Sequence, residues 1–521
     1  MLPYKGCTRA SFGCDVRKVL IANRGEVAVR IIRACRELAL PCAAVYSEAD
    51  RDALHTRLAD QALPIGGAPP ADSYLNIARL IDAARACGAD AVHPGYGFLA
   101  ESPEFAAAAQ DAGLKFVGPP PAVIARVGDK IAARRLMDRS GIPVPPGYAE
   151  PGATDQALAA AAERIGGPLL IKAAGGGGGR GMRFVEVPSS ILETLASARR
   201  EARAAFGSDD LFLERRLEQV RHIEIQIAAD ERGKICHLAE RECSVQRRHQ
   251  KLIEEAPSPF VTSTLRRKLA EAALAAASAA EYVNIGSVEF LVEPSGRFFF
   301  LEINPRLQVE HGVTELTMGV DLVKLQLRIA AGEALPALPA EARGHAIECR
   351  IYAEDPAHGF VPSPGPVLAL KEPTGHGIRV DSGLRAGWQV PAAYDPLVAK
   401  VMAWDRTRDD AIARMREALR NYAILGCRTN LGFVQDVIRH ELFRSGETTT
   451  RFLERHFAAW QQHIGEDLLA AAAAAVLAEA QPSGAPSDRS DASAAGRAAA
   501  ASMAWDPWSR LGRWRMGGDR G

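Results

Sequence analysis

Residues 286–304 read GSVEFLVEPSGRFFFLEIN, and this stretch is the one that decides the fold. Two strand-like runs, 286–293 and 298–304, flank the turn residues 294–297 (Pro-Ser-Gly-Arg), a pattern typical of a β-hairpin. Pairing Glu293 with Phe298 brings Glu289 opposite Glu302, with Cβ atoms about 4.5–5.5 Å apart on one face. Two such carboxylates repel each other unless a cation or a shared proton lies between them.

The same face continues beyond the acidic pair. Asn304 shares the face of Glu302, and Arg306, Gln308 and Glu310 keep this parity if the chain stays extended. Because 298–301 and Ile303 are apolar, we expect Glu302 to enter a buried site where a hard divalent cation offsets its charge. A surface hairpin with solvated Glu side chains is the alternative, and the apolar strand disfavours it.

The composition of the whole chain is balanced. Its 521 residues are long enough for about three domains, and 63 basic residues match 63 acidic ones, so charge gives no argument for nucleic acid or an anionic membrane as partner. No apolar stretch is long enough to span a bilayer, and residues 1–15 lack an apolar signal core, so we expect a soluble, cytoplasmic protein. Nine scattered cysteines without a Cys-x-x-Cys pair predict neither a disulfide framework nor a zinc site.

The N-terminal part has a βαβ pattern. A strand over 18–22, a helix over 27–38 and a strand over 42–46 predict a Rossmann-like domain, and a helix over 74–87 then leads into a strand over 91–93. The G-x-G-x-x-G spacing of a dinucleotide site is missing. From residue 143 a strand over 169–172, a glycine run, a strand over 182–185 and a helix reaching residue 205 predict a small α/β lid.

The remainder to about residue 460 reads as a larger α+β region. It contains the hairpin, a strand over 235–239 and helices over 265–282 and 409–421. Alanine-rich and then Pro/Ser/Gly/Asp-rich sequence follows, which is typical of a linker, and three tryptophans after it (Trp505, Trp508, Trp514) suggest the start of a further folded unit. The predicted organisation is a tail (1–15), the Rossmann-like domain (16–130), the lid with its linker (131–216), the C-terminal domain (217–460), a linker (461–503) and a domain fragment (504–521).

A phosphate site is predicted within the lid. Lys172 supplies a fixed positive charge, and the five glycines 175–179 leave backbone N–H groups free to approach phosphate oxygens. Taken alone, the run fits a flexible hairpin tip equally well. Beside a two-carboxylate metal site the phosphate clamp is favoured, and ATP with magnesium satisfies both features.

The sequence alone does not decide the role of two cationic features. Residues 246–251 (QRRHQK) form a dense basic segment directly after the predicted strand over 235–239, which fits either a solvated face or a site that contacts several oxygens. Arg350 ends an alternating strand, and the sequence does not decide on which side of the sheet it lies.

Eight segments, in order between about Val16 and Phe457, resemble biotin carboxylase, an ATP-grasp enzyme. They are HPGYGFLAE (93–101), GDK (128–130), IKAAGGGGGRGM (171–182), ERECSVQRRHQK (240–251), EEAPSP (254–259), SVEFL (287–291), LEINPRLQVEHGVTE (301–315) and ECRIYAEDP (348–356). The resemblance implies a mixed α/β and α+β fold, with a Rossmann-like N-terminal domain, an ATP-grasp lid and a larger C-terminal α+β domain.

The resemblance also implies the site residues. The positions that match ATP-binding ones are Lys130, Lys172, Gly178, Gly179, Glu214, Arg215, Arg216, Leu217, His222, His249, Glu289, Leu291 and Glu302. Those that match magnesium or manganese ligands are Glu289, Glu302 and Asn304. Those that match the bicarbonate and biotin site are Tyr96, Lys251, Arg306, Gln308, Val309, Glu310 and Arg350. The hinge, residues 214–217 (ERRL), departs from relatives that have lysine and an aromatic residue there, which bears on fine nucleotide preference.

For the mechanism, the resemblance implies that Glu310 deprotonates bicarbonate, which attacks the γ-phosphate of ATP to give carboxyphosphate. Lys172, Lys251 and the metal offset the charge, Arg306 holds bicarbonate and Arg350 stabilises the ureido oxygen of biotin. Lid closure would exclude water from the reactive intermediate.

The C-terminal segments AWDRTRDDAIARMREAL (403–419) and DPWSRLGRWRMGG (506–518) resemble acyl-CoA carboxylase α subunits. The partners thus implied are a biotin carboxyl carrier protein or domain, the β subunit of a carboxyltransferase, and a second copy of this chain in a homodimer. No Met-Lys dipeptide occurs, so biotin is expected on a carrier not found in this chain. Two alternatives stay open: another ATP-grasp ligase, such as a carbamoyl-phosphate-forming enzyme, and an inactive ATP-binding scaffold.

Overall fold

The computed structural model describes residues 16–175, 181–186 and 191–462. The tail, Gly178, Gly179, nearly all of the predicted linker and the predicted terminal fragment lie outside these described residues. The chain divides into two compact units, Met1–Gln462 and His463–Gly521, and all that follows concerns the first.

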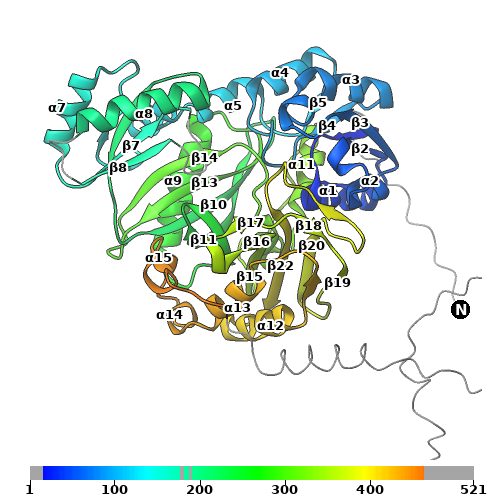
Figure 1. Cartoon of the computed structure of the whole chain (residues 1–521). Helices are drawn as coiled ribbons and strands as arrows, with labels where there is room; N and C mark the ends of the chain where they lie inside the picture. Colours follow the sequence, from blue (N-terminus) through cyan, green and yellow to red (C-terminus); the bar gives the residue numbers. More distant parts are fainter. Residues whose placement is uncertain (1–15, 176–180, 187–190, 463–521) are drawn as a thin grey trace, which may run out of the picture. The chain divides into compact units, whose positions relative to one another are not determined.

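The N-terminal part is a parallel sheet of five strands, in the order β3-β2-β1-β4-β5 (Figure 1). The strands are β1 (Val19–Ile21), β2 (Cys42–Ser47), β3 (Gln61–Gly66), β4 (Ala91–His93) and β5 (Lys115–Phe116). Its helices are α1 (Gly25–Glu37), α2 (Leu54–Leu58), α3 (Ile77–Cys87), α4 (Pro103–Asp111) and α5 (Pro121–Gly128). This confirms the Rossmann-like prediction. Helix α3 begins three residues later than expected, because the Asn76 side chain caps it by accepting a hydrogen bond from the backbone N–H of Arg79.

A small antiparallel sheet, in the order β6-β9-β7-β8, forms the lid. Its strands are β6 (Gly147–Tyr148), β7 (Leu169–Ala173), β8 (Met182–Val185) and β9 (Leu211–Arg215). Helices α7 (Asp155–Ile165) and α8 (Ile191–Phe206) pack on it through one apolar cluster. Helix α6 (Lys130–Arg139) precedes this lid in the chain.

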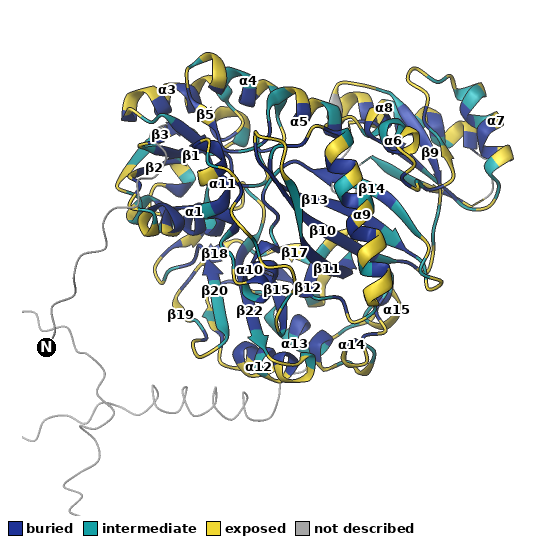
Figure 2. Ribbon diagram, turned by 180° about the vertical axis from the view of Figure 1, so that it is seen from behind, coloured by how far each residue is buried: buried dark blue, intermediate teal, exposed yellow. Residues whose placement is uncertain are grey.

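An eight-stranded sheet, in the order β14-β13-β10-β11-β12-β15-β22-β20, carries most of the predicted site. Its strands are β10 (Arg221–Ala229), β11 (Ile235–Arg247), β12 (Gln250–Ala256), β13 (Asn284–Val292), β14 (Phe298–Asn304), β15 (His345–Tyr352), β20 (Ile378–Ser382) and β22 (Leu397–Asp405). Apolar residues of β10 and β13 pack on α9 (Ser263–Ala279), and those of β15 and β22 pack on α12 (Arg408–Arg420) and α13 (Leu431–Arg439). Figure 2 shows the strands largely buried and the outer helix faces exposed.

The opposite side of this sheet meets α10 (His311–Met318), which contacts β11, β12, β15 and β22. Helix α11 (Leu322–Ala330) contacts β13 and α1. Because strand residues alternate between faces, the residues between the apolar ones point toward α10. Charged side chains of several strands therefore share the space beneath this one helix.

The remaining elements are short and lie mainly at the edges. They are β16 (Glu354–Asp355), β17 (Val361–Pro362), β18 (Gly365–Pro366), β19 (Ala369–Lys371), β21 (Gln389–Val390), β23 (Ala423–Leu425), α14 (Glu441–Arg444) and α15 (Phe452–His456). Among the described residues, no helix is both long and apolar enough to cross a membrane.

The predicted acidic hairpin is β13–β14, and Glu289 does lie opposite Glu302. The predicted pairing at the turn is wrong, since Phe298 lies opposite Val292 rather than Glu293. A bulge corrects the register: Phe290 pairs with Phe300 and Glu289 with Glu302, so Leu301 is the extra residue. The acidic pair therefore exists because of a bulge that the pattern of turn residues does not reveal.

Two further expectations are corrected. The predicted strand over 235–239 continues to Arg247, because β11 and β12 form a long hairpin, so the basic segment 246–251 lies at its turn rather than after a strand. The chain also does not stay extended to Glu310: β14 ends at Asn304 and α10 begins at His311.

Candidate functional site

The two hairpin acids occupy different environments. Glu289 is buried, and its carboxylate accepts hydrogen bonds from Lys251 (2.7 Å) and Asn304 (2.8 Å) and contacts Nε2 of His222 (2.7 Å). Glu302 pairs with Lys130 at 2.9 Å, and 27% of its side chain is exposed because β14 is the edge strand. The expected burial of Glu302 is thus only partial, and it lies at the rim of the site.

Both carboxylates are held in the ionised form. Burial raises the pKa of Glu289, but Lys251 and His222 outweigh it and hold this pKa well below the ordinary range. Burial and the negative charge of Glu289 raise the pKa of Glu302. Lys130 acts against both, and the pKa of Glu302 lies below its ordinary value. Two ionised carboxylates on one face, with the amide oxygen of Asn304 two residues along, fit a hard divalent cation such as Mg²⁺ or Mn²⁺.

Lys251 is the centre of the site. Its ammonium group donates to three carboxylates, those of Glu224 (2.8 Å), Glu289 (2.7 Å) and Glu310 (2.7 Å). The second oxygen of Glu310 accepts a hydrogen bond from Arg350 at 2.9 Å. One ammonium therefore connects the predicted metal acid to the predicted base.

Arg350 points into this cluster, which settles the direction that the sequence left open. Its Nε donates to Glu254 at 2.5 Å while its other arm reaches Glu310. Burial raises the pKa of Glu254 to about 7, and Arg350 opposes that rise. Arg350 thus bridges two acids of unlike proton affinity.

Glu310 is an ionised carboxylate in this arrangement. Burial raises its pKa, but Lys251, Arg350 and Arg241 outweigh burial and hold the pKa well below its ordinary range. A carboxylate so strongly held is a weak base. It can accept a proton only when its cations are shared with a second anion, so the geometry couples base strength to anion binding.

The loop between β14 and α10 gathers the remaining anion-binding residues. Arg306 donates to Asn304 (3.1 Å), Gln308 (2.8 Å) and Glu101. Gln308 in turn donates to Ser287 at 2.5 Å and to Glu289 at 3.4 Å. Although the chain is no longer extended here, these hydrogen bonds hold the side chains of Arg306 and Gln308 beside Asn304 and Glu289, two of the predicted metal ligands.

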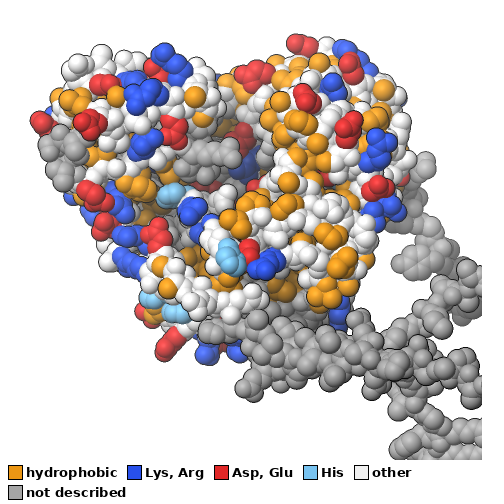
Figure 3. All heavy atoms as spheres, in the orientation of Figure 1, with side chains coloured by type: hydrophobic (Ala, Val, Ile, Leu, Met, Phe, Trp, Pro, Cys, Tyr) orange, Lys and Arg blue, Asp and Glu red, His pale blue; other side chains and the backbone are white. Residues whose placement is uncertain are grey.

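The lid contributes a second charged group. Lys172 pairs with Glu214 of β9, which also accepts a hydrogen bond from Arg134 of α6 at 2.8 Å. Figure 3 shows a hollow between the part that carries α7 and α8 and the part that carries α3 and α4, with acidic and basic side chains visible inside it. Lys172 and Glu214 are buried.

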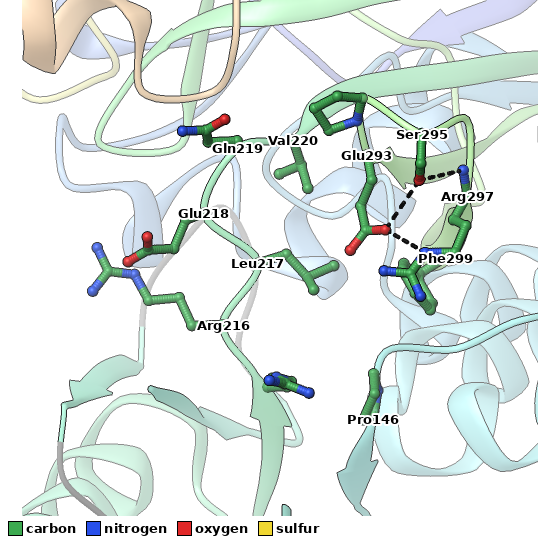
Figure 4. Close-up of a pocket in the computed structure, with 12 residues that line it drawn as sticks. Pro146, Arg216, Leu217, Glu218, Gln219, Val220, Glu293, Ser295, Arg297 and Phe299 are labelled. Atoms are coloured by element: carbon green, nitrogen blue, oxygen red, sulfur yellow. Dashed lines mark hydrogen bonds and ion pairs between the residues drawn. The ribbon is translucent and has the colours of Figure 1, made fainter. Parts of the chain in front are cut away.

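The hinge residues Arg215, Arg216 and Leu217 line a cavity of about 540 Å³ instead. Figure 4 shows this cavity between the hinge and the hairpin turn, where Glu293 accepts hydrogen bonds from Ser295 and Arg297. None of the predicted metal residues lines it. The cavity and the charged cluster are therefore distinct features.

Three further predicted residues lie on different elements of the structure. His249 is at the β11–β12 turn with φ +66°, and Phe184 of the lid strand β8 stacks on its ring, with ring centroids 6.3 Å apart. Leu291 lies in β13 opposite His222 of β10. Tyr96 follows β4, and Asn23 positions it by donating to the backbone carbonyls of Pro94 (2.6 Å) and Tyr96 (2.8 Å).

Sequence reasoning missed three charged residues of the cluster. Arg241 is fully buried, pairs with Glu224 and donates to Gln226 (2.6 Å) and Thr314 (2.8 Å). Glu224 lies opposite Glu289 on the neighbouring strand, and Glu254 holds Arg350. The alternation in residues 222–227 (HIEIQI) is the signal that could have revealed a polar strand face at Glu224.

Three family profiles match the chain: "Biotin carboxylase, N-terminal domain" over 15–124, "Carbamoyl-phosphate synthase L chain, ATP binding domain" over 129–338 and "Biotin carboxylase C-terminal domain" over 348–455. The chain is 49% identical to a biotin carboxylase of Halalkalibacterium halodurans (84% of this chain, 98% of the relative) and 48% to a pyruvate carboxylase subunit of Methanothermobacter thermautotrophicus (84% and 90%). It is 46% identical to the methylcrotonoyl-CoA carboxylase α subunit of Oryza sativa (85% of this chain) and spans 60% of that relative's length.

A solved structure is similar over the same region. The biotin carboxylase domain dimer of Hydrogenobacter thermophilus 2-oxoglutarate carboxylase, in complex with MgADP, ADP and bicarbonate, superposes with a TM-score of 0.83 at 42% identity. The match covers 86% of this chain and 99% of that one.

Proposed function

The chain belongs to the biotin carboxylase family, and from this premise we propose how its residues divide the reaction. The reaction is the ATP-dependent carboxylation of biotin by bicarbonate, with biotin carried on a separate carrier protein. The observation that supports this division best concerns the Glu310 carboxylate, which accepts hydrogen bonds from Lys251 and Arg350. The same Lys251 ammonium group also donates to Glu289.

The nucleotide lies at the lid side of Lys251. Lys130 and Lys172 face its phosphates, and hinge residues 214–217 and Leu291 contact the nucleoside. His222 and His249 lie at the rim of the nucleotide site. Gly178 and Gly179, the other expected phosphate contacts, lie outside the described residues. Glu289, Glu302 and Asn304 would hold Mg²⁺ or Mn²⁺, and the bound ion would offset the negative charge of the phosphate oxygens. The ionised state of both acids supports this assignment.

Bicarbonate lies between Arg306 and Glu310, beside Gln308 and the backbone of Val309. As it binds, the anion shares Lys251 and Arg350 with Glu310, which frees the carboxylate to take the bicarbonate proton. The resulting carbonate oxygen attacks the γ-phosphorus, ADP leaves, and carboxyphosphate forms. Lys251 offsets the charge that develops during this transfer.

Biotin then approaches from the side of Tyr96 and Arg350. Carboxyphosphate separates into carbon dioxide and phosphate, and the phosphate takes the N1′ proton of biotin. Arg350 stabilises the negative charge on the ureido oxygen, and N1′ attacks carbon dioxide to form carboxybiotin. A guanidinium already bound to Glu254 and Glu310 is preorganised for this task.

For the wider assembly, we propose as partners a biotin carboxyl carrier protein, the β subunit of a carboxyltransferase, and a second copy of this chain in a homodimer, within an acyl-CoA carboxylase of the cytoplasm. Relatives named for different acceptors, pyruvate carboxylase in one case and methylcrotonoyl-CoA carboxylase in the other, leave the acceptor to the partner. The ATP-binding profile named for carbamoyl-phosphate synthase keeps that reaction as the second candidate.

One assay separates these functions. The purified chain is incubated with MgATP and bicarbonate, with either free biotin or ammonia added, and ADP release, carboxybiotin and carbamoyl phosphate are measured. We expect bicarbonate-dependent ATP hydrolysis that biotin stimulates. Carbamoyl phosphate formed from ammonia would favour the second candidate, and no turnover at all would favour a scaffold.

The variant Arg350→Ala tests the division of labour. It should lower carboxybiotin formation by about 100-fold or more, because the ureido anion loses its positive partner. ATP binding should stay within about threefold, since the two acids that Arg350 binds, Glu254 and Glu310, lie outside the proposed nucleotide site. Full carboxylation by this variant would refute the role of Arg350.

A further inference from the structure

Lys400 of β22 is a buried cation that the reaction scheme above does not use. Its side chain is fully buried, and its closest polar contact is a backbone carbonyl: Nζ donates to the oxygen of Val309 at 2.6 Å. Val309 directly precedes Glu310, the proposed base. A fully buried ammonium group thus contacts the peptide that leads into the catalytic carboxylate.

Three acids surround Lys400, yet none is closer than that carbonyl. Glu26 of α1 lies 3.6 Å away and Asp381 of β20 lies 3.9 Å away. Asp381 is bound by Arg379 at 2.7 Å. Glu348 of β15 accepts no hydrogen bond from the described residues, and burial raises its pKa well above the ordinary range.

Lys400 also lies near Tyr96. The ammonium lies 5.8 Å from the centre of the Tyr96 ring, whose hydroxyl is buried and has no hydrogen-bond partner among the described residues. Lys400 therefore lies near two parts of the proposed biotin and bicarbonate site, the Tyr96 ring and the Val309–Glu310 peptide.

Stability does not account for a lysine here. Removing an ammonium group from water is costly, and a buried cluster of charges can often be replaced as a whole by apolar side chains of similar volume with no loss of stability. A methionine would fill the same space without that cost. The cation is therefore more useful for what it contacts than for the packing it provides.

We propose that Lys400 is a positioning residue of the carboxylation reaction, which holds the Val309 carbonyl so that the 306–310 loop presents Arg306 and Glu310 to bicarbonate. The proposal rests on the proposed function of Glu310. Lys400 itself touches no reacting atom. Its effect is on bicarbonate use, while the nucleotide site, formed by other residues, is unaffected.

The test compares Lys400→Met with Glu26→Gln in the full chain. Lys400→Met should lower kcat/KM for bicarbonate by about 10- to 100-fold, because small displacements of a catalytic group cost rates of that order. KM for ATP should stay within about twofold. The midpoint temperature of unfolding should fall in Lys400→Met, because Glu26 and Asp381 lose a positive partner, so the kinetics are measured well below that midpoint. Glu26→Gln removes a neighbouring acid but leaves the Lys400–Val309 bond, so its kcat/KM for bicarbonate should stay within about twofold.

Each outcome decides the proposal. Bicarbonate use at the wild-type level in Lys400→Met would overturn it, and so would an equal loss in Glu26→Gln, which would indicate a merely structural cluster. If Lys400→Met does not fold, the double variant Lys400→Met/Glu26→Gln removes both charges together. Its kcat/KM for bicarbonate should fall by the same factor as is expected for Lys400→Met. A wild-type chain without biotin-stimulated turnover would overturn the proposed function and this proposal with it, whereas an active wild type with an unaffected variant overturns only the role of Lys400.

Discussion

At the scale of single residues, the site works because a few cations are shared among many acids. Lys251 alone contacts three carboxylates, those of Glu224, Glu289 and Glu310. Removing one partner from such a buried network costs more than the contact itself, because the others are left unpaired. Substitutions at the rim are therefore easier to interpret than substitutions at the centre.

Glu302 is the rim residue that best tests the metal assignment. In Glu302→Gln the amide still accepts a hydrogen bond from Lys130 but loses its charge, so we expect the Mg²⁺ concentration for half-maximal ATP hydrolysis to rise about 10- to 100-fold. Activity at high Mg²⁺ should recover in part. The measurement is a Mg²⁺ titration of bicarbonate-dependent ATP hydrolysis.

The control for this variant is Glu281→Gln, which removes an exposed carboxylate that pairs with Arg126 just before the same hairpin. Its Mg²⁺ dependence should match that of the unaltered chain. An unchanged dependence in Glu302→Gln as well would contradict the metal role of Glu302.

At the scale of elements, the bulge at Leu301 and the β11–β12 turn determine which side chains meet. Without the bulge, Glu289 would lie opposite Leu301 and the two acids would fall on different faces. The β11–β12 turn carries His249 toward the lid, where Phe184 of β8 stacks on it and Arg216 of the hinge lies 4.7 Å from the Phe184 ring. These rings connect the lid to the eight-stranded sheet.

Phe184→Ala tests whether this stack helps to close the lid over the nucleotide. Aromatic pairs contribute about 0.5–1.5 kcal/mol beyond buried area, and Phe184 is 49% exposed, so we expect KM for ATP to rise about two- to fivefold. The kcat for saturating ATP should change less. Steady-state kinetics at varied ATP make the measurement.

Leu192→Ala is the matched control, because Leu192 is an apolar lid residue that is 52% exposed and makes no ring contact with His249. Its KM for ATP should equal that of the unaltered chain. A similar rise in both variants would show that the effect is general to the lid.

At the scale of the whole molecule, α1 of the N-terminal sheet packs against β20 and β22 of the eight-stranded sheet. Glu26 of α1 is buried at this junction, and its carboxylate accepts no hydrogen bond within the described residues. Burial raises its pKa from 4.5 to about 7, although Lys400 opposes the rise. Burial at this junction therefore favours the protonated, neutral form of Glu26.

This gives the junction a defined pH dependence. A folded-state pKa above the unfolded one means that the contribution of Glu26 to stability is present below about pH 4.5 and is lost as the pH rises through about 7. The loss is at most about 3 kcal/mol, since one pKa unit corresponds to about 1.4 kcal/mol. Glu26→Gln should therefore become more stable relative to the unaltered chain between pH 5 and pH 8, as measured by urea unfolding.

Glu37→Gln, in the same helix, is a control of opposite sign. The pKa of Glu37 is lowered by its hydrogen bond with Lys324, so its contribution is present above the unfolded pKa and is lost as the pH falls. This variant should be the less stable one at pH 8 and should approach the unaltered chain at low pH. Equal pH profiles for Glu26→Gln and the unaltered chain would contradict the raised pKa of Glu26.

Much of this arrangement was readable from local patterns. The βαβ opening and the lid strands follow from alternation and turn residues and agree with the structure, and the pairing of Glu289 with Glu302 is confirmed although a bulge produces it. The strand ending at residue 239, the extended chain to Glu310 and the pairing of Glu293 with Phe298 are wrong, and the expected burial of Glu302 is only partial. Each of these errors concerns contacts with a neighbouring strand or an edge position, which a local pattern does not contain. The domain boundaries and the individual site roles stay predictions.

Local sequence patterns are enough to identify the available chemistry: an acidic hairpin, a lysine before a glycine run, and motifs specific enough to indicate the family. How these groups share their charges depends on the folded arrangement. Arg241, Glu224 and Glu254 entered the site through strand pairing, and Lys400 reached Val309 across 91 residues of chain. The physical reason is that periodicity is set by the backbone of one segment, whereas the proton affinity and direction of a buried charge are set by whichever partners the fold brings within hydrogen-bond distance.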